Sequence, residues 1–173
     1  MADVGIHTET ERKFLVLSDA FKAEAVASHR IKQGYIARDN GNSVRVRIKD
    51  NTGILTIKGP SADDISRTEW EIEIPLADAE ALLKLCHGGI IDKTRHIIPE
   101  PSGRFFEVDE FYGDNEGLVM AEIELENASD AFEKPSWPGS SPMAVRLSHS
   151  SFGNPLPICL AAIILLVDGS GRW

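Results

Sequence analysis

Apolar and polar residues alternate along much of the first 126 residues, and this period of two is the pattern of half-buried β-strands. In residues 44–49 (V-R-V-R-I-K) the alternation is strict. Turn sequences such as D-N-T-G and Y-G-D-N-E-G join neighbouring runs over short distances, as antiparallel hairpins require. The pattern predicts strands at residues 7–16, 32–38, 44–49, 54–58, 67–74, 90–98, 104–111 and 118–126.

Three segments depart from this pattern and predict short helices. Residues 18–29 are rich in alanine and begin with Ser18 and Asp19, which favour a helix N-cap. Residues 76–87 follow the helical period and end before a Gly-Gly pair. Residues 127–134 start at an asparagine and stop at a proline. Strands joined by short antiparallel connections, with a few helices, indicate a fold of the α+β class.

The charged residues of several predicted strands share one face and one sign. One strand places Arg45 and Arg47 on the same face, and another places Glu122 and Glu124 together. An ordinary sheet, charged outside and apolar inside, is the simplest interpretation of any single strand. Like charges on one face repel each other, however, and bring no benefit on a bare surface. The whole set is explained by a closed antiparallel barrel with a charged lumen and helices packed outside.

Composition limits the partners that such a barrel can have. The chain has 173 residues, 42% of them hydrophobic, which suits one globular domain with a real core. A net charge of −9 argues against binding to a nucleic-acid backbone. The longest apolar run, residues 156–167, contains a proline and is too short to span a bilayer. With two widely spaced cysteines and no signal-peptide pattern, we expect a cytoplasmic protein without membrane or nucleic-acid partners.

The two kinds of charged face suggest one kind of chemistry. Guanidinium and ammonium groups match phosphate oxygens, so the basic faces suit an anion with several negative groups. Clustered carboxylates suit Mg²⁺ or Mn²⁺, which bridge to such an anion. The sequence has no G-x-x-x-x-G-K-[ST] loop and no H-E-x-x-H motif. The charged faces therefore predict a phosphoryl-transfer site that depends on a divalent metal.

The ordered set of motifs resembles the CYTH, or triphosphate tunnel metalloenzyme, superfamily. E-T-E-R-K-F-L-V is similar to the E-x-E-x-K signature, and V-R-V-R, L-T-I-K, R-T-E-W-E-I-E-I, K-T-R, F-E-V-D and A-E-I-E-L-E follow in order. The resemblance covers residues 7 to 137 and is closest to bacterial inorganic triphosphatases. It implies a tunnel of eight antiparallel strands whose lumen binds a triphosphate with a divalent metal.

The resemblance also implies roles for individual residues. Metal binding is expected of the acidic residues Glu9, Glu11, Glu69, Glu71, Asp109, Glu122 and Glu124. Phosphate binding is expected of the basic residues Lys13, Arg45, Arg47, Lys58, Arg67, Lys93 and Arg95. The residues expected to act most directly in catalysis are Glu9, Glu11, Lys13 and Glu71.

Hydrolysis of inorganic tripolyphosphate with Mg²⁺ or Mn²⁺ is the function that these expectations favour. Three alternatives stay open: a thiamine triphosphatase, a class IV-type adenylate cyclase acting on ATP, and a non-catalytic module that binds polyphosphate or nucleotides. The sequence identifies no nucleobase pocket, which the cyclase would need. It leaves open the preferred triphosphate, the metal and the oligomeric state.

The last 36 residues differ from the rest of the chain. Residues 138–173 contain only three charged residues, which are Arg146, Asp168 and Arg172. Members of the family usually carry an acidic stretch and a D-[KR]-x-[YF]-x-N motif here, and neither is present. We therefore divide the chain into a tunnel domain, residues 1–137, and an atypical tail, residues 138–173. The tail is either a partner-covered or poorly ordered extension, or an altered, frame-shifted end.

Overall fold

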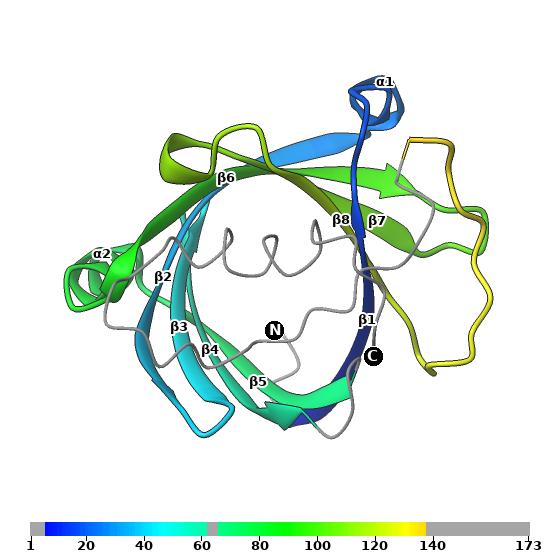
Figure 1. Ribbon diagram of the computed structural model, residues 1–173. Helices are drawn as coiled ribbons and strands as arrows, with labels where there is room; N and C mark the ends of the chain where they lie inside the picture. The colour runs from blue at the N-terminus through cyan, green and yellow to red at the C-terminus, as the bar shows by residue number, and fades with distance from the viewer. Residues whose placement is uncertain (1–5, 62–65, 138–173) are drawn as a thin grey trace, which may run out of the picture.

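Eight antiparallel strands close into a barrel in the computed structural model, which describes residues 6–61 and 66–137 (Figure 1). Around the barrel the strands follow the order β1-β5-β4-β3-β2-β6-β7-β8, and every neighbouring pair is antiparallel. The α+β class and the closed eight-stranded barrel are thus confirmed. The strands are β1 His7–Leu15, β2 Ala27–Asp39, β3 Asn42–Lys49, β4 Thr52–Ser61, β5 Ser66–Ile74, β6 His87–Pro99, β7 Phe105–Phe111 and β8 Val119–Glu124.

The helix predicted at residues 18–29 is wrong for most of its length. Only α1, Phe21–Glu24, is helical, and β2 begins already at Ala27. Phe21 is fully buried, whereas the segment after it pairs along β6, where Ser28 lies opposite His96. The ladder with β6 satisfies the backbone of this alanine-rich segment, so tertiary pairing outweighs its helix propensity.

The other two predicted helices are also shorter or absent. The second, α2, spans Leu76–Leu83, and the Gly-Gly pair after it lies within β6. No helix forms at residues 127–134. There the side chains of Arg12 and Arg104 donate hydrogen bonds to the carbonyls of Ala128 and Ala131, which a helix would use itself. A short 3₁₀ helix, η1 Gly113–Asn115, lies between β7 and β8.

The main hydrophobic core lies outside the barrel, not within it. Phe14, Phe106 and Ile123 point outward from β1, β7 and β8 and are buried beneath α1 and the segment that ends at Trp137. The Trp137 ring meets those of Phe21 and Phe106 edge to face, at centroid distances of 6.0 and 5.6 Å. This arrangement leaves the inner face of the strands to polar residues.

Replacing Trp137 with alanine should lower the free energy of unfolding by about 3–5 kcal/mol, the cost of removing a buried aromatic side chain. The residue is 2% exposed and is the last of the described chain. Urea denaturation followed by circular dichroism measures the change. An unchanged midpoint would show that the segment before the tail is not part of the core.

Helix α2 covers a second part of the barrel exterior, over β3 and β4. Its Ala79 side chain is fully buried against Gly53 of β4. A Cβ atom at position 53 would lie 2.7 Å from the Cβ of Ala79 and 2.8 Å from the carbonyl of Ile74, so only glycine fits there. Among the described residues, no helix is long and apolar enough to cross a membrane.

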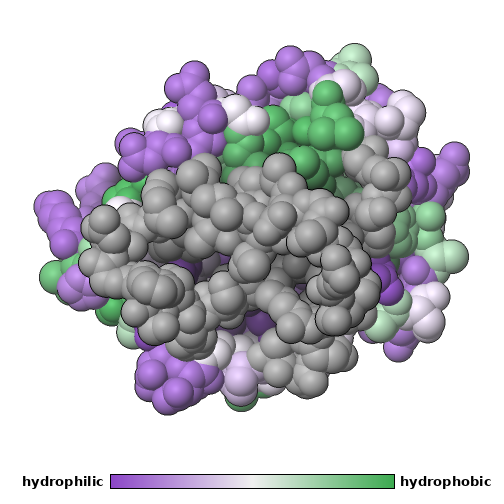
Figure 2. Space-filling view, viewed as in Figure 1, coloured by the Kyte–Doolittle hydropathy of each residue, from purple (hydrophilic) through white to green (hydrophobic). Residues whose placement is uncertain are grey.

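Figure 2, in the same view as Figure 1, shows where polar and apolar side chains gather on this face. Hydrophilic residues cover most of the described rim and are visible inside the ring, while a group of hydrophobic residues lies in the upper part of the view. The interior of the barrel is therefore lined by polar side chains that could form a functional site.

Candidate active site in the lumen

Strand register brings the acidic and basic residues of the predicted site to the inside of the barrel. Lys13 of β1 lies directly opposite Glu122 of β8, and Arg95 of β6 lies opposite Asp109 of β7. Thr56 of β4 lies between Arg45 and Glu71 on the two flanking strands. Because residues two apart share a face, all of the residues assigned to metal or phosphate line the lumen.

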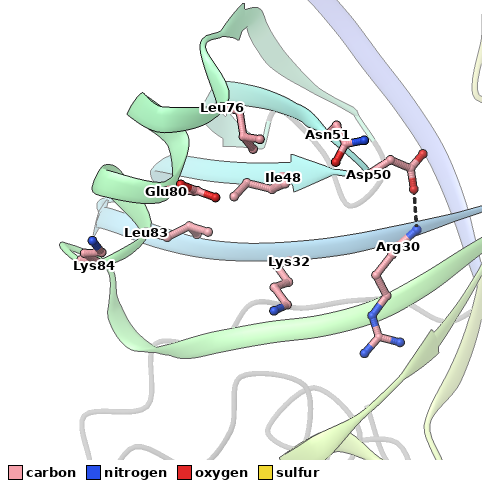
Figure 3. Close-up of a pocket in the computed structure, with 9 residues that line it drawn as sticks. All are labelled: Arg30, Lys32, Ile48, Asp50, Asn51, Leu76, Glu80, Leu83 and Lys84. Atoms are coloured by element: carbon pink, nitrogen blue, oxygen red, sulfur yellow. Dashed lines mark hydrogen bonds between the residues drawn. The ribbon is translucent and has the colours of Figure 1, made fainter.

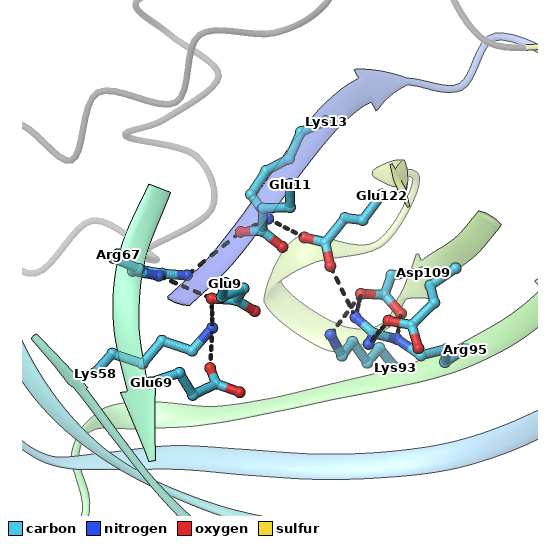
Figure 4. A network of polar contacts seen from close by, with 11 residues as sticks. Glu9, Glu11, Lys13, Lys58, Arg67, Glu69, Lys93, Arg95, Asp109 and Glu122 are labelled. Carbon is cyan, nitrogen blue, oxygen red and sulfur yellow. Dashed lines mark hydrogen bonds and ion pairs between the residues drawn. The ribbon is translucent and has the colours of Figure 1, made fainter. Parts of the chain in front are cut away.

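One wall of the lumen is a cluster of three carboxylates and two cations (Figure 4). The Lys58 ammonium lies 2.5 Å from a carboxylate oxygen of Glu9 and 2.5 Å from one of Glu69. Arg67 donates a hydrogen bond to Glu9 at 3.1 Å and reaches Glu11 at 3.4 Å. Burial acts to raise the pKa of Glu9, but Lys58 and Arg67 together lower it to about 2.

Lys13 joins this cluster to the next strand. Its ammonium lies 2.6 Å from Glu11 and also contacts Glu122. Burial and repulsion from Glu122 raise the pKa of Glu11 despite the attraction of Lys13. Burial and repulsion from Glu9 likewise raise the pKa of Glu124. This side of the lumen therefore holds more negative charge than its lysine neutralises.

Asp109 is the most deeply buried carboxylate of the site, at 1% exposure. It accepts two hydrogen bonds from Arg95 at 2.7 Å each and one from Lys93 at 2.5 Å. Burial opposes ionisation, yet these cations lower the pKa of Asp109. Arg95 also reaches Glu122 at 3.1 Å, so the ion pairs run continuously from Asp109 to Glu9 (Figure 4).

Positive charge is in excess on β3. Arg45 lies 3.8 Å from Glu71, its nearest carboxylate partner, and Arg47 makes no ion pair with any described residue. The Nε atoms of both are buried without a hydrogen-bond partner in the described structure. Burial, followed by repulsion from Arg45 and Arg95, lowers the pKa of Arg47 to about 10. Buried guanidinium groups with so little carboxylate compensation could hold an anion.

Three lumen residues were not predicted from the sequence because they carry no formal charge. Thr56 donates a hydrogen bond to Glu71 at 2.7 Å, and the side-chain oxygen of Gln33 is buried without a partner in the described part of the chain. Tyr35 lies opposite Arg45. Burial acts to raise the pKa of Tyr35, but Arg45 and Arg38 lower it. The sequence signal that could have identified Gln33 and Tyr35 is their spacing of two residues, which places both side chains on one face of β2.

The donor set fits a divalent cation, although the ligands are not assembled around one position. No group of three or more carboxylate, histidine or cysteine side chains in the described chain is arranged to hold a metal as it stands. Lys13 occupies the space between Glu11 and Glu122 instead. Carboxylate oxygens are the ligands that hard divalent cations prefer. Burial and the neighbouring charge of Glu122 raise the pKa of Glu11, and a cation would neutralise that negative charge.

Stability should fall on acidification because of Glu9. Its pKa is about 2 in the folded protein against 4.5 for a free side chain, so the stabilising charge is present above pH 4.5. That contribution is lost as the pH falls from 4.5 towards 2. Melting temperatures measured over this range should drop less steeply in Glu9→Gln than in the wild type. Parallel curves would contradict the ion pairs assigned to Glu9.

A second concavity lies outside the barrel, between α2 and strands β2 and β3 (Figure 3). Its volume is about 480 Å³, and its lining mixes Lys32 and Lys84 with Glu80 and apolar side chains. Arg30 at its edge is engaged elsewhere, because it pairs with Asp92 at 2.8 Å. The surplus of buried charge is in the lumen, which is therefore the candidate site.

Comparison with known proteins identifies the family of the barrel. The family model described as CYTH domain matches residues 7–145. The match extends eight residues beyond the predicted boundary at residue 137, and the tail itself lies outside the described residues.

Two curated relatives are similar in sequence to about three quarters of the chain. An inorganic triphosphatase from Acetivibrio thermocellus is 47% identical over 132 residues, which cover 76% of this chain and 83% of that protein. An inorganic triphosphatase from Nitrosomonas europaea is 34% identical over 135 residues, which cover 76% of this chain and 87% of that protein.

Solved structures share the barrel as well. An inorganic triphosphatase structure is 28% identical, with a TM-score of 0.53 over 79% of this chain and 89% of that chain. A protein from Pyrococcus horikoshii is 19% identical, with a TM-score of 0.57 over 70% of this chain and 80% of that chain. The latter likeness shows the fold alone.

Proposed function

Because the chain belongs to the CYTH domain family, we propose that it hydrolyses inorganic tripolyphosphate within the lumen, with Mg²⁺ or Mn²⁺. The observation that carries the proposal is the unneutralised charge of both signs on facing walls. Arg45 and Arg47 lack close carboxylate partners, while Glu11 and Glu124 have raised pKa values. A triphosphate together with a divalent cation would satisfy both walls. The curated relatives named inorganic triphosphatase support the choice of substrate.

The basic residues bind and orient the substrate in this proposal. Arg45, Arg47 and Lys93 present donors to the phosphate oxygens, where charge accumulates in phosphoryl transfer. The pKa of Lys93, about 8, is lowered by burial and by Arg95 and Arg47 despite attraction to Asp109. An anion placed between these cations relieves their repulsion, so binding energy is available before any chemistry occurs.

The acidic residues hold the metal in this proposal. Glu9, Glu11, Glu122 and Glu124 are the best placed, whereas Asp109 is already enclosed by Lys93 and Arg95. A bound divalent cation would neutralise phosphate oxygens and polarise the reacting phosphoryl group. If these carboxylates held a cation, Lys13 and Lys58, which now pair with them, would be available to bind phosphate. Glu69 and Glu71 lie on the neighbouring strand β5, opposite Lys58 and Thr56 of β4, and add negative charge to the acidic side of the lumen.

A substrate panel tests the proposal. Purified protein receives tripolyphosphate, thiamine triphosphate or ATP, each with Mg²⁺, with Mn²⁺ or with EDTA, and released phosphate and cyclic AMP are both measured. We expect phosphate release from tripolyphosphate with either metal and none with EDTA. Cyclic AMP from ATP would favour the cyclase, and preferred cleavage of thiamine triphosphate would change the substrate. Tight tripolyphosphate binding without turnover would favour a binding module.

A further inference from the structure

The lumen is not charged along its whole length. At the end where β1 and β7 finish and β6 and β8 begin, the inner face carries apolar side chains. Phe111 shares a face with Asp109, Ile91 with Lys93, and Met120 with Glu122, since each pair is two residues apart on one strand. The apolar end cluster consists of Ile91, Phe111 and Leu118, with Tyr35 and Met120 packed against it.

This apolar end cluster is packed and borders the cations directly. Ile91, Phe111 and Leu118 are only 6–8% exposed, so their side chains fill the space that they line. Lys93 lies opposite Phe111 in register, with its ammonium 5.5 Å from the ring centroid. Arg38, on the last residues of β2, is engaged with Tyr35, its guanidinium carbon 3.4 Å from the ring centroid. The cationic part of the lumen therefore stops at an apolar wall.

The opposite end of the lumen carries carboxylates, together with Lys49 at the end of β3. Glu107 and Glu124 lie there on β7 and β8, and Glu73 lies near the end of β5. The Glu107 side chain is 40% exposed and pairs with Arg95. Burial, with repulsion from Glu9 and Glu107, raises the pKa of Glu124. An anion that extends past the central cations in this direction meets carboxylates. In the other direction it meets the apolar end cluster.

A phosphate group loses hydration when it is pushed against apolar side chains and gains no hydrogen bond in return. We propose that the apolar end cluster limits the length of the polyphosphate chain, so that the lumen accepts three phosphates and rejects the continuation of a longer chain. Phe111 and Ile91 are the residues that set this limit. The inference rests on the proposed function and adds to it a discrimination by chain length.

The test compares kcat/KM for tripolyphosphate with kcat/KM for long-chain polyphosphate in the full chain. The wild type should prefer tripolyphosphate, and Phe111→Ala should reduce that preference by ~10-fold, the scale on which apolar contacts discriminate substrates. Ile91→Ala, a smaller truncation in the same cluster, is the second variant should Phe111→Ala fail to fold. The control is Ile57→Ala, because Ile57 is 42% exposed and lies on the outer face of β4, opposite in direction to Lys58.

The outcomes separate the inference from the proposed function. Absence of tripolyphosphate hydrolysis by the wild type contradicts the proposed function. Equal kcat/KM for short and long chains in the wild type overturns only the length limit. So does an unchanged preference in a folded Phe111→Ala or Ile91→Ala variant, or an equal loss of preference in Ile57→Ala.

Discussion

Glu11→Ala is expected to reduce metal-dependent turnover of tripolyphosphate by more than ~100-fold. Mutating a residue that only hydrogen-bonds a metal ligand costs up to ~100-fold, and loss of a ligand itself should cost more. Glu11 is one of the lumen carboxylates left with surplus negative charge, since burial and Glu122 raise its pKa. The same surplus means that its removal costs little stability: the repulsion is relieved as the contacts to Lys13 and Arg67 are lost.

Initial rates at several Mg²⁺ and Mn²⁺ concentrations measure the effect, and a melting curve reports stability. The control is Glu110→Ala, because Glu110 is a carboxylate of the outer face of β7 that pairs with Lys22. We expect this variant to keep wild-type turnover. Full activity in Glu11→Ala would show that the carboxylate of Glu11 on β1 is not needed to bind the metal.

Arg47→Met should raise the KM for tripolyphosphate about 10- to 100-fold, the value of one or more hydrogen bonds to a charged partner. The same variant should melt at the wild-type temperature or above it. In the free protein, burial and then repulsion from Arg45 and Arg95 lower the pKa of Arg47 to about 10, so its charge costs folding free energy. A side chain that destabilises the folded protein but strengthens binding of the anion has a binding function and not a structural one.

Steady-state kinetics and thermal melting, with and without tripolyphosphate, test this pair of effects together. Arg12→Met is the control, because the Arg12 side chain leaves the outer face of β1 and binds the carbonyl of Ala128. It should leave KM unchanged. A large loss of stability in Arg47→Met, with KM unaltered, would make Arg47 a structural residue.

The barrel could be predicted because its strands carry unusually regular patterns. The one-sided charge of residues such as Arg45, Arg47, Glu122 and Glu124 indicated both the strands and the inward direction of their charged faces. The segment after Phe21 could not be predicted correctly, since its helix propensity is real and only the pairing with β6 outweighs it.

The sequence could not show which lumen carboxylates are already paired with cations or where the charged part of the lumen ends, because both depend on the three-dimensional structure. The family resemblance assigns Asp109 to metal binding. The motif F-E-V-D that contains it does not indicate that Lys93 and Arg95 enclose its carboxylate. Likewise, the apolar side chains of Ile91 and Phe111 look like ordinary core residues in the sequence. Their place on the inner face follows from register, which joins strands distant in the chain.

Crystals of the protein soaked with tripolyphosphate and Mn²⁺, whose anomalous scattering locates the metal, would show directly whether the lumen binds both. We expect the anion in the lumen, with its oxygens bound by Arg45, Arg47 and Lys93, and the manganese signal beside Glu9 and Glu11. Tripolyphosphate bound instead in the concavity between α2 and strands β2 and β3, beside Lys32 and Lys84, would contradict a binding site in the lumen, provided that the lumen ion pairs are unchanged.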